Sequence, residues 1–257
     1  MTLPLDPSSV ELAARLKTEV RSCSVVETRP LSTNLHAVTL RGSASILTGV
    51  PGNDVMIRVE KEPGSFVRRR YSVRAVNPEQ DEFTLWISTS HEGAGSAWVK
   101  RARPGDAVDV VGPRGKIHLD PMADWHLFVG DISGLAAFYR LAESIEPPGR
   151  AIFVVEIDDP SDAVTATFDE GLGVTGIFID RCGRAKNDPA GLLSGLAAFA
   201  LPPDEGHAYL FGEFSVVKVV QSALIDRGLS LALIHRKPFW RAGLANADHG
   251  EPVKTES

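Results

Sequence analysis

The stretch His126-Leu127-Phe128-Val129-Gly130-Asp131-Ile132-Ser133-Gly134-Leu135 divides the chain into two kinds of sequence. It begins with a short apolar run, continues through turn-forming residues, and from Leu135 carries apolar residues at helical spacing. The helix should end before Pro147-Pro148-Gly149, because proline cannot continue a helix. The stretch therefore predicts a strand, a tight turn and a helix.

On the C-terminal side, the same alternation of β-rich runs and helical segments continues. Such alternation favours a mostly parallel sheet flanked by helices. We expect this α/β domain to cover residues 123–245 and to be followed by a loose tail, 246–257. The expected strands are His126–Val129, Ile152–Ile157, Val174–Asp180, His207–Phe211 and Leu229–His235, and the later helices are Pro189–Phe199 and Ser215–Arg227.

On the N-terminal side, residues 1–122 show short β-like runs separated by turn residues. Six such runs favour a small closed or nearly closed antiparallel barrel. A helix over Ser8–Arg21 is expected to precede them, with Ser8 and Glu11 as a capping box. The expected barrel strands are Cys23–Thr28, Leu35–Arg41, Asp54–Val59, Arg70–Ala75, Glu82–Thr89 and Ala107–Gly112.

The bulk composition narrows the class of protein. A net charge of −6 and a pI of about 5.7 argue against a nucleic-acid-binding protein. Cys23 and Cys182 form no CxxC pair, and the seven histidines show no zinc-binding spacing, so no metal site is expected. The N-terminus lacks signal-peptide character, and no apolar run reaches the roughly 20 residues of a membrane-spanning helix. We therefore expect a cytoplasmic protein without membrane insertion.

Two local patterns are interpreted as structural. Gly171-Leu172-Gly173-Val174-Thr175-Gly176 satisfies G-x-G-x-x-G but leads into an expected strand, whereas a dinucleotide fingerprint opens a helix. The acidic run Asp158-Asp159-Pro160-Ser161-Asp162 is expected to be a solvated loop.

Residues 68–98 hold the candidate site. Arg68-Arg69-Arg70-Tyr71-Ser72-Val73-Arg74 combines guanidinium groups that suit phosphate, a ring that suits stacking and a hydroxyl that suits a ring nitrogen. About twenty residues later, the small-residue loop Gly93-Ala94-Gly95-Ser96-Ala97-Trp98 could present backbone N–H groups to a pyrophosphate. Together these features indicate a flavin dinucleotide in the barrel domain, although an isolated Arg-Tyr-Ser is usually an ordinary strand surface.

These motifs resemble those of the siderophore-interacting proteins, FAD-dependent ferric-siderophore reductases of the ferredoxin-reductase-like superfamily. That family has R-x-Y-[ST]-x-R, matched here by Arg69 to Arg74, then G-x-[AG]-S-x-W, P-G-D and G-P-R-G. The resemblance covers roughly residues 20–245. It also includes the turn at Gly130, the pair Gly212-Glu213 and the segment Lys237-Pro238-Phe239-Trp240-Arg241-Ala242-Gly243.

The resemblance assigns roles to individual residues. Arg69 would contact the FAD phosphates, Tyr71 would stack on the isoalloxazine, and Ser72 would bond near its N5. Gly95 and Ser96 would hold the pyrophosphate, and Trp98 of the same motif would also bind the cofactor. His91 would either touch the cofactor or only cap the loop. Asp131 and Ser133 would contact nucleotide.

The resemblance also implies a reaction. NADH or NADPH would reduce the flavin, which would pass electrons to a ferric siderophore or another ferric chelate, and Fe(II) would be released in the cytoplasm. Lys237 and Arg241 are the candidate substrate-binding residues, with Arg103 as a weaker one; all three could equally be solvated surface charges. No residue is assigned as a catalytic acid or base.

A second hypothesis stays open. Ile132, Ser133 and Ala136 differ from the family's G-D-E-T-A-L-P-A turn. A flavin-binding protein without nicotinamide activity, which uses a reduced ferredoxin or only binds a ligand, would also account for the motifs.

Overall fold

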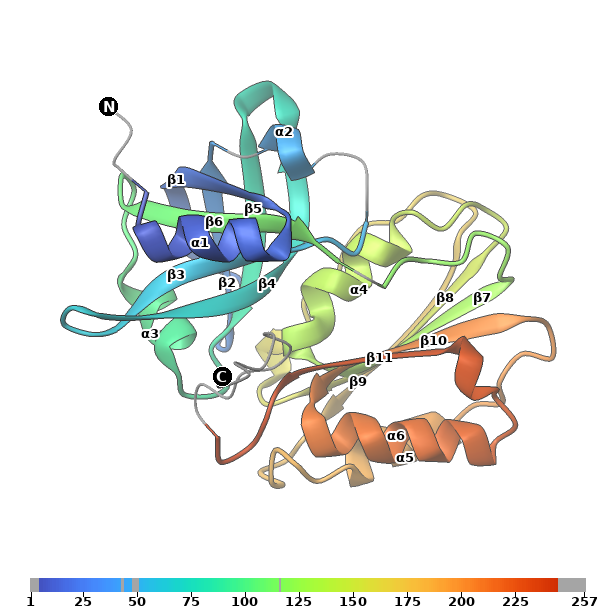
Figure 1. Cartoon of the computed structure of the whole chain (residues 1–257). Coiled ribbons are helices and arrows are strands. Elements are labelled where there is room, and N and C mark those ends of the chain that lie inside the picture. Colours follow the sequence, from blue (N-terminus) through green and yellow to red (C-terminus); the bar gives the residue numbers. More distant parts are fainter. Residues whose placement is uncertain (1–4, 43, 48–50, 116, 245–257) are drawn as a thin grey trace, which may run out of the picture.

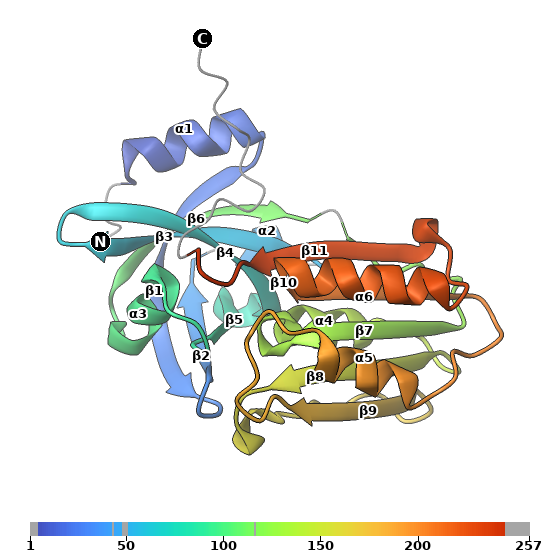
Figure 2. The ribbon, with the colours of Figure 1, turned by 90° about the horizontal axis from the view of Figure 1, so that it is seen from below.

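The computed structural model describes residues 5–42, 44–47, 51–115 and 117–244. Six antiparallel strands form a closed barrel in the order β1-β2-β5-β4-β3-β6, and a parallel five-stranded sheet follows in the order β11-β10-β7-β8-β9 (Figures 1 and 2). The predicted fold class is therefore confirmed. The domain boundary near residue 122 stays a prediction; β6 ends at Arg114 and β7 begins at Trp125.

The barrel domain has short helices at its surface. Its strands are β1 (Glu19–Pro30), β2 (Leu35–Arg41), β3 (Asp54–Glu62), β4 (Ser65–Asn77), β5 (Glu82–Ser88) and β6 (Ala107–Arg114). Its helices are α1 (Pro7–Leu16), α2 (Ala44–Leu47) and α3 (Ala94–Arg101), with a single 3₁₀ turn η1 (Pro78–Gln80).

The α/β domain places helices on both faces of its sheet. Its strands are β7 (Trp125–Asp131), β8 (Arg150–Ile157), β9 (Gly173–Asp180), β10 (Gly206–Glu213) and β11 (Ile234–Trp240). Its helices are α4 (Leu135–Ala142), α5 (Ala190–Ala197) and α6 (Phe214–Asp226), with 3₁₀ turns η2 (Ile132–Gly134), η3 (Pro160–Asp162) and η4 (Leu231–Leu233).

The interior strands of this sheet are buried on both faces, which explains their continuous apolar runs. Every residue of β7 and β10 is buried. Helix α4 lies between the sheet and the barrel, and α5 and α6 cover the opposite face (Figure 1). The carboxyl ends of the strands point toward the barrel (Figure 2). Parallel sheets bind ligands at the carboxyl ends of their strands.

Several predicted bounds were wrong. Helix α1 ends at Leu16 because Lys17 has a left-handed backbone (φ 52°), and Val20 belongs to β1. The cap of α1 is Asp6, which accepts a hydrogen bond from the Ser8 N–H at 3.0 Å, so the Ser8–Glu11 capping box is not formed. The last strand begins at Ile234 instead of Leu229, because Leu231–Leu233 forms a 3₁₀ turn, and it runs on to Trp240. As predicted, residues 171–176 lead into a strand, β9.

The acidic run after β8 is a solvated loop only in part, because Pro160 and Ser161 are exposed but Asp162 is buried. Asp162 is fully buried and accepts hydrogen bonds from Ser32 Oγ (2.6 Å) and from the Asn34 N–H (2.9 Å) and Nδ2 (2.8 Å). Ser32 and Asn34 belong to the turn between β1 and β2, so this carboxylate ties the barrel to the sheet. Arg74 of β4 makes a second tie, an ion pair of 2.6 Å with Glu143 after α4.

Three histidines and a tyrosine lie side by side at the amino ends of β7, β10 and β11. His207 Nδ1 lies 2.9 Å from His235 Nε2, and Tyr209 Oη lies 3.4 Å from His126 Nδ1. Burial, reinforced by the neighbouring His207, lowers the pKa of His126 to about 4 from an ordinary value of 6.5. The folded protein therefore holds this imidazole neutral.

We expect the free energy of unfolding to fall as the pH drops below 6.5, because the unfolded chain then binds a proton that folded His126 takes up only near pH 4. Between pH 7 and pH 5 the loss from this residue should be about 2 kcal/mol. Urea unfolding at both pH values measures it. His126→Gln should be less stable at pH 7 but less pH-dependent; an unchanged pH dependence would contradict the assignment.

Candidate functional site

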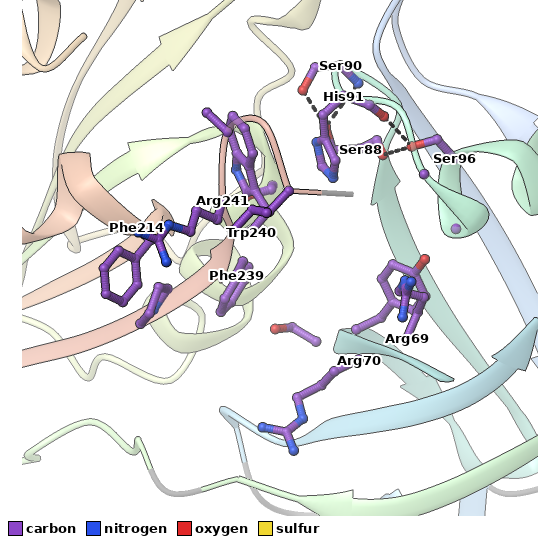
Figure 3. A pocket seen from close by; sticks show the side chains of 18 of the residues that line it. Arg69, Arg70, Ser88, Ser90, His91, Ser96, Phe214, Phe239, Trp240 and Arg241 are labelled. Carbon is purple, nitrogen blue, oxygen red and sulfur yellow. Dashed lines mark hydrogen bonds between the residues drawn. The ribbon is translucent and has the colours of Figure 1, made fainter. Parts of the chain in front are cut away.

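A large cavity of about 1150 Å³ lies where the barrel meets the carboxyl end of β11 (Figure 3). This volume lies slightly above the roughly 300–1000 Å³ of typical small-molecule pockets, so an extended dinucleotide has room. The barrel wall comprises Met56, Arg68–Ser72, Trp86, Ser88, Ser90–Gly93, Gly95 and Ser96; the opposite wall comprises Ser133, Ala136, Lys186, Phe214 and 236–244.

The charge of this cavity is opposite to that of the whole chain. Of the residues that the structure describes, seven basic side chains line it against one acidic side chain, Glu92, although the net charge of the chain is −6. Clustered charge of one sign in a concave surface attracts ligands of the opposite sign. The basic residues are Arg68, Arg69, Arg70, Lys186, Arg236, Lys237 and Arg241.

Strand β4 supplies the first predicted group. Arg69, Tyr71 and Ser72 all line the cavity, and Arg69 and Tyr71 share one face of the strand. A Cβ at position 95 would lie only 1.9 Å from Tyr71 Oη, so the absence of a side chain at Gly95 lets the tyrosine lie where it does. Burial raises the pKa of Tyr71, which keeps its hydroxyl protonated.

The small-residue segment after β5 is a helix start and not a loop. Gly93 is the N-cap of α3 and no side chain caps the helix, while Gly93, Gly95 and Ser96 line the cavity. The Ser96 hydroxyl donates to the carbonyls of His91 (2.6 Å) and Ser88 (3.3 Å), so it fixes the preceding loop. A helix N-terminus offers unsatisfied backbone N–H groups to anions. The segment can therefore still bind an anion as expected, although it does so as the first turn of a helix and not as a loop.

His91 meets the other domain across the cavity. Its ring is stacked on Trp240 at the end of β11, with centroids 4.8 Å apart and planes at 2° (Figure 3). Burial lowers the pKa of His91; Lys186 acts in the same direction and Asp131 opposes it. The imidazole is therefore neutral at pH 7, and its buried Nδ1 has no hydrogen-bond partner among the residues that the structure describes.

Two of the predicted cofactor-binding residues lie outside the cavity lining. Trp98 is 7% exposed and packs in the barrel core. Asp131 accepts hydrogen bonds from the Ser133 N–H (2.8 Å), Trp240 Nε1 (2.9 Å) and the Glu213 N–H (3.2 Å), so its carboxylate orders the turn and the Trp240 ring. Ser133 does line the cavity, and within the described part of the chain its buried Oγ has no hydrogen-bond partner.

Both substrate-binding candidates line the cavity, whereas Arg103 does not. Lys237 forms an ion pair with Asp54 of the barrel. Arg241 lies over the ring of Phe214, with its guanidinium carbon 5.0 Å from the ring centroid.

Sequence reasoning missed part of the site. Arg236 and Trp240 were placed past the end of the last strand, and the extension of β11 brings both to the cavity. Lys186 and Asp54 carry no local pattern that marks them, because their partners are distant in sequence. For these missed residues, one signal was available in the sequence: the segment Lys237–Gly243, which contains Trp240 and resembles a motif of the family.

A closed antiparallel barrel followed by a parallel sheet is the ferredoxin-reductase-like fold, and in this chain a cationic cavity lies where the two meet. Residues 57–117 match the model of the siderophore-interacting FAD-binding domain, and residues 123–243 match that of the siderophore-interacting protein. The chain belongs to the siderophore-interacting protein family.

Individual relatives agree with this assignment. The ferric vibriobactin reductase of Vibrio cholerae is 26% identical over 196 residues, which cover 74% of this chain and 69% of that protein. An uncharacterised protein of Mycobacterium tuberculosis is 29% identical over 157 residues, 58% of this chain and about half (55%) of the length of that protein. The crystal structure of a siderophore utilization protein from T. fusca has the same fold, with a TM-score of 0.78, 24% identity and coverage of 90% of this chain and 96% of that one.

Among the residues that the structure describes, no helix combines the length and apolar character needed to cross a membrane.

Proposed function

We propose that the protein is an FAD-dependent reductase of ferric siderophores, which passes electrons from NADH or NADPH to chelated Fe(III) and releases Fe(II) in the cytoplasm. The observation that carries the proposal is the cationic cavity at the junction of the two domains. It combines Tyr71, the uncapped start of α3 and clustered arginines, in a chain that matches the siderophore-interacting FAD-binding domain.

The residues present fit FAD. Arg69 and the first turn of α3 would hold the phosphates, because a guanidinium and free backbone N–H groups both bind phosphate oxygens. Tyr71 would lie against the isoalloxazine ring, with Ser72 beside it. The buried Ser133 Oγ and His91 Nδ1, which have no hydrogen-bond partner in the described ranges 5–42, 44–47, 51–115 and 117–244, are further polar atoms available to a ligand.

The residues around this ligand have binding and orienting roles. Bound flavin supplies the redox chemistry, since it links two-electron donors to one-electron acceptors. Reduction of iron requires no proton transfer from the protein, so the lining needs no general acid or base. Lys237 and Arg241 would attract an anionic ferric chelate. Fe(II) binds hard oxygen ligands more weakly than Fe(III), so reduction would release the iron.

We expect that anaerobic addition of NADH or NADPH to the yellow protein, with a ferric chelate and a ferrous-specific chromophore, will bleach the flavin and yield ferrous colour. The control is the same mixture without protein. If neither NADH nor NADPH bleaches the flavin or produces ferrous colour, the donor assignment is contradicted.

One observation favours the alternative of a flavin protein without nicotinamide activity. The Asp131 carboxylate at the turn after β7 is engaged by three donors from its own domain, including Trp240. It is therefore not free to bind a nucleotide in this arrangement. Under the alternative, a reduced ferredoxin would support ferrous release where both nicotinamides fail.

A further inference from the structure

A buried carboxylate lies directly behind two of the cationic side chains of the cavity. The side chain of Asp54, at the start of β3, is 2% exposed and does not line the cavity. Its Oδ2 binds Lys237 Nζ of β11, and its Oδ1 lies 3.4 Å from Arg70 Nε of β4. One acid of the barrel thus holds one cation from each wall.

This arrangement reduces the charge that the cavity presents. Lys237 and Arg70 would contribute two positive charges, but Asp54 offsets one of them within contact distance. Their side chains are 24% and 22% exposed, so solvent screens the interaction only in part. A buried carboxylate is costly unless it is paired, so Asp54 also holds the Lys237 ammonium against its own carboxylate and limits its freedom to reach a ligand in the cavity.

We propose that Asp54 is a specificity-determining residue, which limits the attraction of the cavity for highly anionic ferric chelates relative to uncharged ones. It acts through Lys237 and Arg70, without touching the chelate. This inference rests on the proposed function, because it concerns the charge of the ferric chelate that the same cavity accepts.

The first test is Asp54→Asn, which keeps the shape of the side chain and removes its charge. Two probes are used: ferric enterobactin, an anionic tris-catecholate, and ferrichrome, an uncharged trihydroxamate. For the anionic chelate we expect KM, and the dissociation constant from quenching of tryptophan fluorescence, to fall about fivefold. For ferrichrome both should change by less than about twofold. Equal changes in KM and dissociation constant for both probes, or a rise in these constants for the anionic chelate, would overturn the inference.

The second test shows whether Asp54 acts through Lys237. Lys237→Gln should weaken binding of ferric enterobactin by less than about twofold in the wild-type background, because there Asp54 holds the lysine ammonium against its own carboxylate, where it is not free to approach the chelate. In the Asp54→Asn background the same change should weaken it by about fivefold. Equal effects in the two backgrounds would show that the pair is not coupled. If Asp54→Asn fails to fold, a loss of fivefold or more in Lys237→Gln alone still overturns the inference.

Two controls separate this inference from the proposed function. Glu27→Gln removes one negative charge from the exposed surface of β1, outside the cavity lining. It should change neither KM nor the dissociation constant for either chelate. Flavin content is measured from the absorption spectrum of each variant before chelate is added. A wild-type protein without flavin, or without ferrous release from any reductant, contradicts the proposed function. Normal flavin and turnover with an unchanged chelate preference in Asp54→Asn contradicts only the role of Asp54.

Discussion

Gly95→Ala is expected to weaken FAD binding by roughly 30-fold, because overpacking of a close contact costs about 2 kcal/mol and tenfold in affinity equals about 1.4 kcal/mol. The added Cβ would lie 1.9 Å from Tyr71 Oη, far inside contact distance, and 3.2 Å from Tyr71 Cζ. The tyrosine must therefore shift from its present place in the cavity lining. Titration of the apoprotein with FAD, followed by flavin fluorescence, measures the change.

A second variant tests the cause. Removal of the hydroxyl by Tyr71→Phe leaves the ring and abolishes the 1.9 Å contact, so FAD binding should recover by at least about tenfold in the double variant relative to Gly95→Ala. Gly176→Ala is the matched control, because a Cβ at that position meets only ordinary contacts at 3.6 Å or more. Failure of the double variant to recover would show that Gly95 is needed for another reason, such as close approach of the ligand to the backbone.

Arg181→Met is expected to lower the free energy of unfolding by about 3 kcal/mol, since it leaves a buried carboxylate with fewer partners. Glu156, at the end of β8, is 1% exposed, and its Oε2 accepts hydrogen bonds from Arg181 Nε (3.0 Å) and Nη2 (2.9 Å). Arg181 also binds Asp158. Arg184 remains 3.2 Å from Glu156 Oε1, which keeps the expected loss at the lower end of the range for buried pairs. Urea unfolding measures the change.

Two further variants test whether the unpaired charge of Glu156 causes the loss of stability in Arg181→Met. Glu156→Gln combined with Arg181→Met removes both charges, so it should be more stable than Arg181→Met alone by about 2 kcal/mol. Arg184→Met removes the more exposed partner, which is 32% exposed, and should cost about 1 kcal/mol. A double variant no more stable than the single one would show that packing, and not the charge of Glu156, dominates.

The candidate site was predictable where its residues are close in sequence. Arg69, Tyr71 and Ser72 lie on one strand and line the cavity, and Gly95 and Ser96 join them through the next strand and helix. The error at residues 93–98 concerned conformation: glycine and serine favour turns, but here Gly93 caps a helix whose face is buried by Trp98 and Val99. Tertiary packing of this face therefore outweighed the intrinsic turn propensity of glycine and serine.

The sequence by itself determined the order and type of most elements, because burial repeats locally along strands and helices and the chain records that repeat. It thereby determined the barrel, the parallel sheet and the strand that carries Tyr71. Only the tertiary structure decided which distant residues meet: Lys237 with Asp54, His91 with Trp240 and Asp162 with Ser32. Such contacts depend on how the two domains pack, and no local period encodes them. For the same reason, an acidic chain carries a cationic cavity that its net charge does not reveal.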